Sequence, residues 1–78
     1  MNSENTFIEM RGDREILIDG VSLLLGYSDK EIMLLLKKRK LRVSGSDLKM
    51  DLMNESRIAI SGKIISVEFA DERRVNGK

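Results

Sequence analysis

The stretch that decides the fold is residues 57–69, RIAISGKIISVEF. Ile58 and Ile60 precede Gly62 at a spacing of two, and a second alternating apolar pair follows it. Apolar residues at this spacing lie on one face of a β-strand. A glycine between two such runs indicates a turn or bulge whose backbone conformation other residues resist. The stretch therefore predicts two short strands that meet at a glycine corner.

The same pattern occurs twice upstream, in residues 41–50 (LRVSGSDLKM) and in residues 16–25 (ILIDGVSLLL). The three copies place Gly20, Gly45 and Gly62 between alternating apolar runs. We predict that these three are structural glycines, which shape a framework and take no part in chemistry.

Working outward from the three copies, the alternating segments are separated by predicted turns at residues 11–14, 27–30, 45–47 and 54–56. Strands spaced about eight to ten residues apart are typical of an all-β sandwich or small barrel, and such short connections favour antiparallel neighbours. We predict eight short strands: Phe7–Met10, Glu15–Asp19, Val21–Gly26, Glu31–Lys37, Lys40–Ser44, Leu48–Leu52, Arg57–Ser61 and Ile64–Ala70.

The predicted core consists of apolar residues on the inward face of these strands. They are Ile16, Ile18, Leu23, Leu25, Leu41, Val43, Leu48, Met50, Ile58, Ile60, Ile65, Val67 and Phe69.

Two alternatives to this sheet remain open. Residues 29–40 also fit a helix, because Ser28 and Glu31 form a capping box before an apolar run with few β-branched residues. The alternation that follows in residues 41–43 favours a strand instead. The second alternative is a short β-solenoid, since two of the glycine copies are one plausible rung apart.

Length and composition predict a single small domain over residues 7–70, with a disordered tail at 1–6 and a flexible basic tail at 71–78. The chain has 78 residues and contains no Cys and no His, so neither disulfides nor the usual zinc site can reinforce it. Self-association is a remaining way to stabilise so small a fold, and we expect a homo-oligomer. No apolar run is long enough to span a bilayer, and the N-terminus lacks the layout of a signal peptide, so we expect a cytoplasmic protein.

Catalysis has little support in this composition. The absence of His and Cys removes the commonest general base and the most reactive nucleophile. Nearly all carboxylates fall in predicted turns or on the polar face of a predicted strand, where a solvated role is usual. We therefore predict that the protein is not an enzyme and has no catalytic, cofactor-binding or metal-binding residues.

One cluster of charge could bind a partner. Five of the six residues between 37 and 42 are basic, and the candidate surface consists of Lys37, Lys38, Arg39, Lys40 and Arg42. A nucleic-acid site is an alternative, but no aromatic residue is interleaved with the charges to stack on bases. Basic residues also solubilise loops and protect the edge strands of sheets, and we favour that interpretation over nucleic-acid binding.

Four segments of the chain together resemble the YabP/YqfC family of small sporulation proteins. They are residues 15–20 (EILIDG), 26–32 (GYSDKEI), 40–48 (KLRVSGSDL) and 57–69 (RIAISGKIISVEF), and the likeness extends from Phe7 to Phe69. The basic residues 37–40 replace what is often a glycine in the family. Length and closing segment are closer to the YqfC branch.

The resemblance implies an immunoglobulin-like antiparallel β-sandwich of about seven to eight short strands. It also implies a role in the mother cell of a sporulating bacterium, in spore coat assembly at the forespore surface. The partners would be other sporulation proteins, including an associated sporulation membrane protein. The family carries no catalytic residues over to this chain.

Overall fold

Six antiparallel strands form one sheet in the computed structural model, which describes residues 7–70. The strands are β1 (Phe7–Arg11), β2 (Glu15–Asp19), β3 (Leu23–Tyr27), β4 (Glu31–Leu35), β5 (Lys40–Leu52) and β6 (Arg57–Phe69). Their order in the sheet is β1-β2-β6-β5-β4-β3. No helix occurs within residues 7–70.

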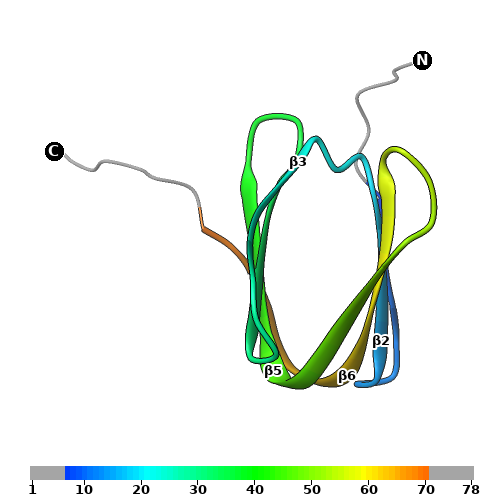
Figure 1. The fold of residues 1–78 in the computed structure, drawn as a ribbon, viewed down its shortest axis with the longest axis vertical. Coiled ribbons are helices and arrows are strands. Elements are labelled where there is room, and N and C mark those ends of the chain that lie inside the picture. Colours follow the sequence, from blue (N-terminus) through cyan, green and yellow to red (C-terminus); the bar gives the residue numbers. More distant parts are fainter. Residues whose placement is uncertain (1–6, 71–78) are drawn as a thin grey trace, which may run out of the picture.

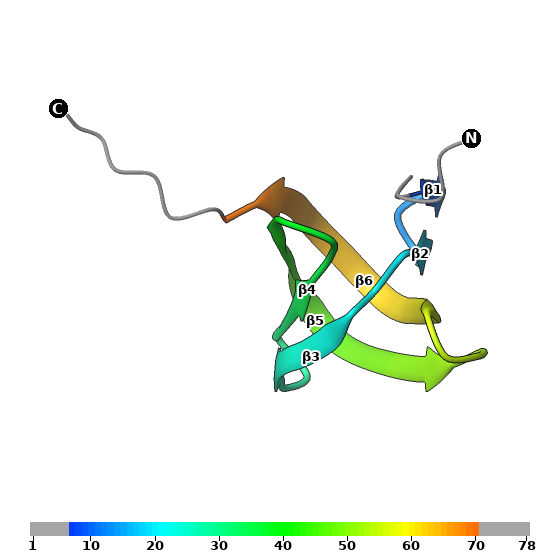
Figure 2. The same cartoon turned by 90° about the horizontal axis from the view of Figure 1, so that it is seen from above.

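The two central strands are long and sharply bent, so that the sheet folds over on itself (Figure 1). One wall of the fold contains β1, β2, the start of β6 and the end of β5. The other wall contains β3, β4, the start of β5 and the end of β6. Seen from above, the two walls face each other across the core (Figure 2). The single sheet thereby buries the apolar faces of its two walls against each other.

Both bends occur at glycines, and the two strands cross closely there. A Cβ atom on Gly45 would overlap the carbonyl oxygen of Lys63, and one on Gly62 would overlap that of Asp47. Gly62 also has φ +127°, a conformation that side chains disfavour. The register of β5 and β6 shifts beside these positions, which marks β-bulges that bend the strands.

These bulges explain why the prediction of seven to eight strands in a sandwich is not confirmed. The predicted strands 40–44 and 48–52 are one continuous strand, β5, and 57–61 and 64–70 are joined as β6. The glycines bend the strands without reversing the chain, so the ladder of hydrogen bonds continues through them.

The two halves of the sheet are related by an approximate two-fold axis between β5 and β6. Residues 15–18 lie opposite residues 61–58, and residues 31–34 lie opposite residues 44–41 in the same relative register. The pairs at the two ends of the β5–β6 ladder correspond in the same way. The equivalent units are β1-β2-β6 and β3-β4-β5.

The hairpin turns attach to the bends in an equivalent manner. Gly62 donates its backbone N–H to the carbonyl of Arg14 at 3.1 Å, and Gly45 donates to that of Lys30 at 3.0 Å. Arg14 lies in the turn between β1 and β2, and β2 is the neighbour of β6 in the sheet. Lys30 lies in the turn between β3 and β4, and β4 is the neighbour of β5. The turns at the ends of the β1–β2 and β3–β4 hairpins therefore help to hold the two bends in place.

The core is composed only of apolar side chains from both walls. Its members are Ile16, Ile18, Val21, Ile32, Leu34, Leu36, Leu41, Val43, Leu48, Ile58, Ile60 and Ile64, with Ile8, Met50 and Val67 packed against them. Four predicted core residues are exposed instead: Leu23, Leu25, Ile65 and Phe69. All four belong to edge segments of the folded sheet, where no further strand covers them.

The helix predicted as an alternative for residues 29–40 is absent, because Ile32, Leu34 and Leu36 alternate into the core from a strand and the turn after it. Ser28 still makes the capping contact that favoured a helix. Its hydroxyl accepts a hydrogen bond from the Glu31 N–H at 3.0 Å, but within a tight turn between two strands. The solenoid alternative is also wrong, because every strand pair is antiparallel. The predicted tails, 1–6 and 71–78, lie outside the described residues.

Candidate functional site

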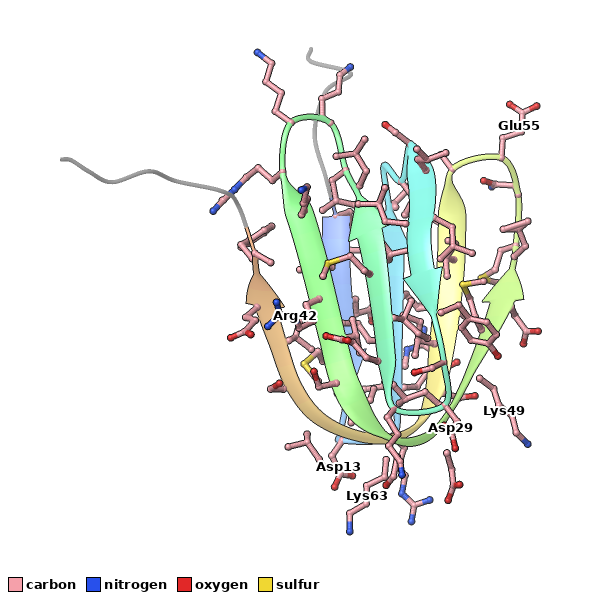
Figure 3. The ribbon with its side chains drawn as sticks, turned by 60° about the vertical axis from the view of Figure 1, so that its left-hand side comes forward. Asp13, Asp29, Arg42, Lys49, Glu55 and Lys63 are labelled. Carbon is pink, nitrogen blue, oxygen red and sulfur yellow. The ribbon has the colours of Figure 1, made fainter. Side chains whose placement is uncertain are left out.

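The outside of the bend carries two open hollows. The first, of about 520 Å³, is lined by Asp29, Asp47, Leu48, Lys49, Ser61 and Gly62. The second, of about 460 Å³, is lined by Asp13, Arg14, Asp47, Gly62 and Lys63. Figure 3 shows Asp13, Asp29, Lys49 and Lys63 projecting at this end of the molecule, with Glu55 at the other end.

The charges around these hollows alternate in sign and do not converge on one point. Asp13, Asp29 and Asp47 are interspersed with basic residues, and Asp13 lies 4.0 Å from Arg14 in an exposed ion pair. Within residues 7–70, no three acidic, His or Cys side chains are close enough together to hold a metal ion. The hollows are solvent-exposed surface around the place where β5 and β6 cross closely.

The predicted basic surface is divided between two places. Lys37, Lys38 and Arg39 are exposed in the turn between β4 and β5, whereas Lys40 and Arg42 lie within β5. The Arg39 guanidinium lies over the Phe69 ring, 3.8 Å from its centroid. That stacking covers part of an exposed aromatic side chain at the end of β6.

Arg42 is held by two carboxylates on the outer face of the sheet. Its Nη1 donates a hydrogen bond to Glu68 Oε2 at 3.0 Å, and its Nε lies 3.0 Å from Glu31 Oε2. Glu31 comes from β4 and Glu68 from β6, so Arg42 connects three neighbouring strands. Figure 3 labels Arg42. The paired carboxylates neutralise this cation and weaken the case for a continuous phosphate-binding strip along residues 37–42.

Gly20 occupies a different kind of position from the other two predicted structural glycines. It has φ +95° and follows β2, where the chain crosses from one wall to the other. Its N–H lies 3.0 Å from the carbonyl of Ser56 and 3.0 Å from Oδ1 of Asp19. Gly20 thus shapes the connection to β3, while Gly45 and Gly62 shape the bends.

Large apolar side chains are exposed at the edges of the folded sheet. Those in residues 7–70 are Phe7 and Met10 of β1, Leu23, Leu24, Leu25 and Tyr27 of β3, Leu52 and Met53 at the end of β5, and Ile65 and Phe69 of β6. The outer strands β1 and β3 each have one neighbour. The ends of β5 and β6 are also edges, because β4 and β2 pair only with the opposite ends.

The edges form two apolar strips on opposite sides of the molecule. In Figure 2, β3 and the end of β5 lie along the lower margin, whereas β1 and the end of β6 lie along the upper one. The approximate two-fold axis relates the two strips. Sequence analysis missed them because alternation predicts which face of a strand is apolar, and not whether another strand covers that face.

The tetrapeptides Asp13-Arg14-Glu15-Ile16 and Asp29-Lys30-Glu31-Ile32 carry a signal that could have revealed the symmetry. They occupy equivalent turns and strand starts in the two hairpins. One unit is continuous in sequence, whereas the other is interrupted between β2 and β6, so the similarity does not appear as a tandem repeat.

Residues 7–70 contain no helix of the length and apolar character needed to cross a membrane. A family model described as the YabP family matches residues 2–76. The chain therefore belongs to the YabP family, which points to a sporulation-related protein. The match does not distinguish the YqfC branch, which stays a prediction. Neither the curated proteins nor the solved structures include a match to this chain.

Proposed function

From membership of the YabP family, we propose that this protein acts in spore formation as a non-enzymatic module that binds other proteins. We place it in the cytoplasm of the mother cell, at the forespore surface, with a role in spore coat assembly. Its partners there would be other sporulation proteins, including a sporulation membrane protein.

The observation that carries this proposal is the position of the exposed apolar side chains. Soluble domains rarely leave many large apolar residues together at the surface unless they bind something. Here such residues line β1, β3 and the free ends of β5 and β6. Exposed strand edges bind extended segments of other proteins by main-chain hydrogen bonds, with side-chain contacts for specificity.

The polar surface supports binding more than catalysis. No polar or charged residue among those described is buried, and the carboxylates near Arg11, Arg42 and Arg57 form ion pairs at the surface. Catalytic groups usually depend on burial or on close partners to adjust their reactivity. A nucleic-acid site is less well supported, because Arg42 is already paired with Glu31 and Glu68.

A fluorescent fusion in a sporulating cell tests the proposal. We expect the fusion to gather at the forespore surface once the mother-cell and forespore compartments have formed. We also expect spores from a deletion strain to have an altered coat in electron micrographs. A fusion that stays diffuse through sporulation, together with a normal coat in the deletion strain, would contradict the proposal.

The basic turn can be tested separately in the same cells. The double variant Lys37→Glu/Lys38→Glu reverses two exposed charges in the β4–β5 turn. The control is Glu55→Lys, which reverses an exposed charge in the turn between β5 and β6. If residues 37–39 contact the partner, only the double variant disperses the fusion; a fusion that stays in place in both strains assigns the contact to the edges.

A further inference from the structure

The two outer strands differ in how they are protected from pairing. β1 carries Glu9 and Arg11, whereas β3 has the sequence Leu-Leu-Leu-Gly-Tyr and no charge. Charged residues on an edge strand discourage pairing with another chain, and an apolar edge without them favours it. The equivalent positions make the contrast direct, since Glu9 lies opposite Leu17 where Gly26 lies opposite Met33.

We propose that β3 is the dimer interface of this protein, where it pairs in antiparallel fashion with β3 of a second copy across a two-fold axis. The six-stranded sheets of the two copies then join into one continuous sheet. The backbone N–H and C=O groups of β3 that point away from β4 would hydrogen bond to the same groups of the second copy.

Charge favours pairing of β3 with β3 of a second copy over pairing of β3 with β1 of a second copy. Pairing β3 with itself brings together two uncharged strands. Pairing it with β1 of another molecule would place Glu9 and Arg11 in the interface, and desolvating such charges is costly. The symmetric arrangement is therefore the one that buries no charge on the paired strands.

The apolar area is sufficient for a small interface. Leu23, Leu24, Leu25, Tyr27, Leu52 and Met53 line this side of the molecule and are each between 42% and 68% exposed. Their exposed parts together equal the surface of about three fully exposed large side chains. Doubled across the axis, with backbone and rim atoms added, the interface approaches the lower end of specific complexes, about 1,000–1,200 Å² in total.

The strand ladder in the dimer would be short. A register shift between Leu24 and Gly26 leaves Leu25 as a bulge, so regular pairing is confined to the residues on either side. Such a short ladder contributes little by itself, and the leucines, Tyr27 and the end of β5 provide most of the contact. We therefore expect a dimer that dissociates on dilution.

Sedimentation equilibrium of the full chain tests the dimer. Between about 5 μM and 0.5 mM, a range that brackets weak self-association, we expect the average mass to rise from 8.9 kDa toward twice that value. A chain that stays monomeric at the highest concentration overturns the proposal and leaves β3 as a surface for a different protein.

Matched lysine variants test the location of the interface. Leu25 of β3 is 43% exposed and Met10 of β1 is 46% exposed, so each can be replaced by Lys at a similarly open edge position. We expect Leu25→Lys to weaken dimerisation at least tenfold, and Met10→Lys to dimerise like the unmodified chain. Equal effects of the two variants, or a larger effect of Met10→Lys, would overturn the assignment to β3.

A second variant covers the case in which Leu25→Lys does not fold. Gly26→Glu copies into β3 the charge that β1 carries at the equivalent position, and a Cβ at Gly26 would lie 3.8 Å from Met33 Cβ, an ordinary contact. This variant should fold, as checked by its circular dichroism spectrum, and remain monomeric; a folded Gly26→Glu that dimerises normally contradicts the proposal.

The β3 dimer rests on the proposed binding function and gives it one partner, a second copy of this chain, but the dimer and the sporulation role can fail separately. A monomer that still gathers at the forespore overturns the dimer alone, whereas a dimer that stays diffuse overturns the sporulation role alone.

Discussion

The two hairpins, β1–β2 and β3–β4, have the same register against the central strands but different surroundings. Each places alternating apolar residues into the core and attaches its turn to a glycine bend. They differ in the residues that the rest of the molecule leaves uncovered: the β1 edge is charged, whereas the β3 edge is apolar. The positions that the two hairpins share maintain the fold. We expect binding at the positions where the hairpins differ, which are the edges of β1 and β3.

The two bends provide the largest expected effect. Gly62→Ala and Gly45→Ala each force a Cβ into a backbone carbonyl of the neighbouring strand. We expect each to lower the free energy of unfolding by more than about 4 kcal/mol, a loss that few single substitutions cause. Gly45→Ala would have the closer overlap, whereas Gly62→Ala adds the backbone strain of φ +127°, so we expect a severe loss from both. Urea unfolding followed by circular dichroism measures both.

The control for the bends is Gly26→Ala, whose new Cβ meets only an ordinary contact with Met33. We expect its stability to lie within about 0.5 kcal/mol of the unmodified protein. If Gly62→Ala were as stable as Gly26→Ala, the close crossing of β5 and β6 would be wrong.

Equivalent core residues provide the next effect. Ile16 in β2 and Ile32 in β4 occupy matching positions and are both fully buried. We expect Ile16→Ala and Ile32→Ala each to cost about 3 kcal/mol, because each removes buried methyl groups and leaves a cavity. Thermal and urea unfolding of the two variants should give similar losses if the halves pack equivalently.

Ile65→Ala serves as the control, since Ile65 is 69% exposed. Its loss should be below about 0.5 kcal/mol in the isolated chain. A loss several times larger for one of the buried isoleucines than for the other would show that the two halves do not contribute equally to the core.

Arg42 gives the smallest effect and lies where the symmetry is broken, since its counterpart in β6 is Ala59. Arg42→Ala removes ion pairs with Glu31 and Glu68 on an accessible face. We expect a loss of about 1 kcal/mol or less, which shrinks further at high salt as the charges are screened. Unfolding in low and high salt measures it.

Arg57→Ala is the matched control, because Arg57 contacts one carboxylate, that of Asp19, at 3.4 Å. Its loss should be smaller than that of Arg42→Ala. A salt-independent loss for Arg42→Ala would mean that packing of the arginine stem matters more than its charge.

The sequence predicts the local structure of this protein well and its edges poorly. Alternation around Gly45 and Gly62 located both central strands. The turns predicted at 11–14, 27–30 and 54–56 fall between strands, except that Arg11 and Tyr27 are the last residues of β1 and β3, whereas the turn predicted at 45–47 is wrong because those residues lie inside β5. The core residues Ile16, Ile18, Leu41, Val43, Leu48, Ile58 and Ile60 were predicted because they share one face of an alternating strand. Ile32 and Leu34 were missed because their segment also fits a helical period.

The candidate basic surface shows the same division. Sequence places five cations within six residues, but strand geometry puts Lys37 and Lys38 in a turn and Arg42 between Glu31 and Glu68. Glu68 is 26 residues from Arg42 in the chain, so no local pattern could have joined them.

By itself, the sequence determined that the chain forms antiparallel strands, where most of them turn, and that glycine is needed at residues 45 and 62. Those features depend on side-chain alternation and on local backbone conformation, which neighbouring residues specify. Only the tertiary structure decided that the glycines bend two continuous strands, that two hairpins flank them symmetrically, and that β3 remains an uncovered apolar edge. These depend on contacts between residues far apart in the chain, and a strand's exposure is settled by whether another strand pairs beside it.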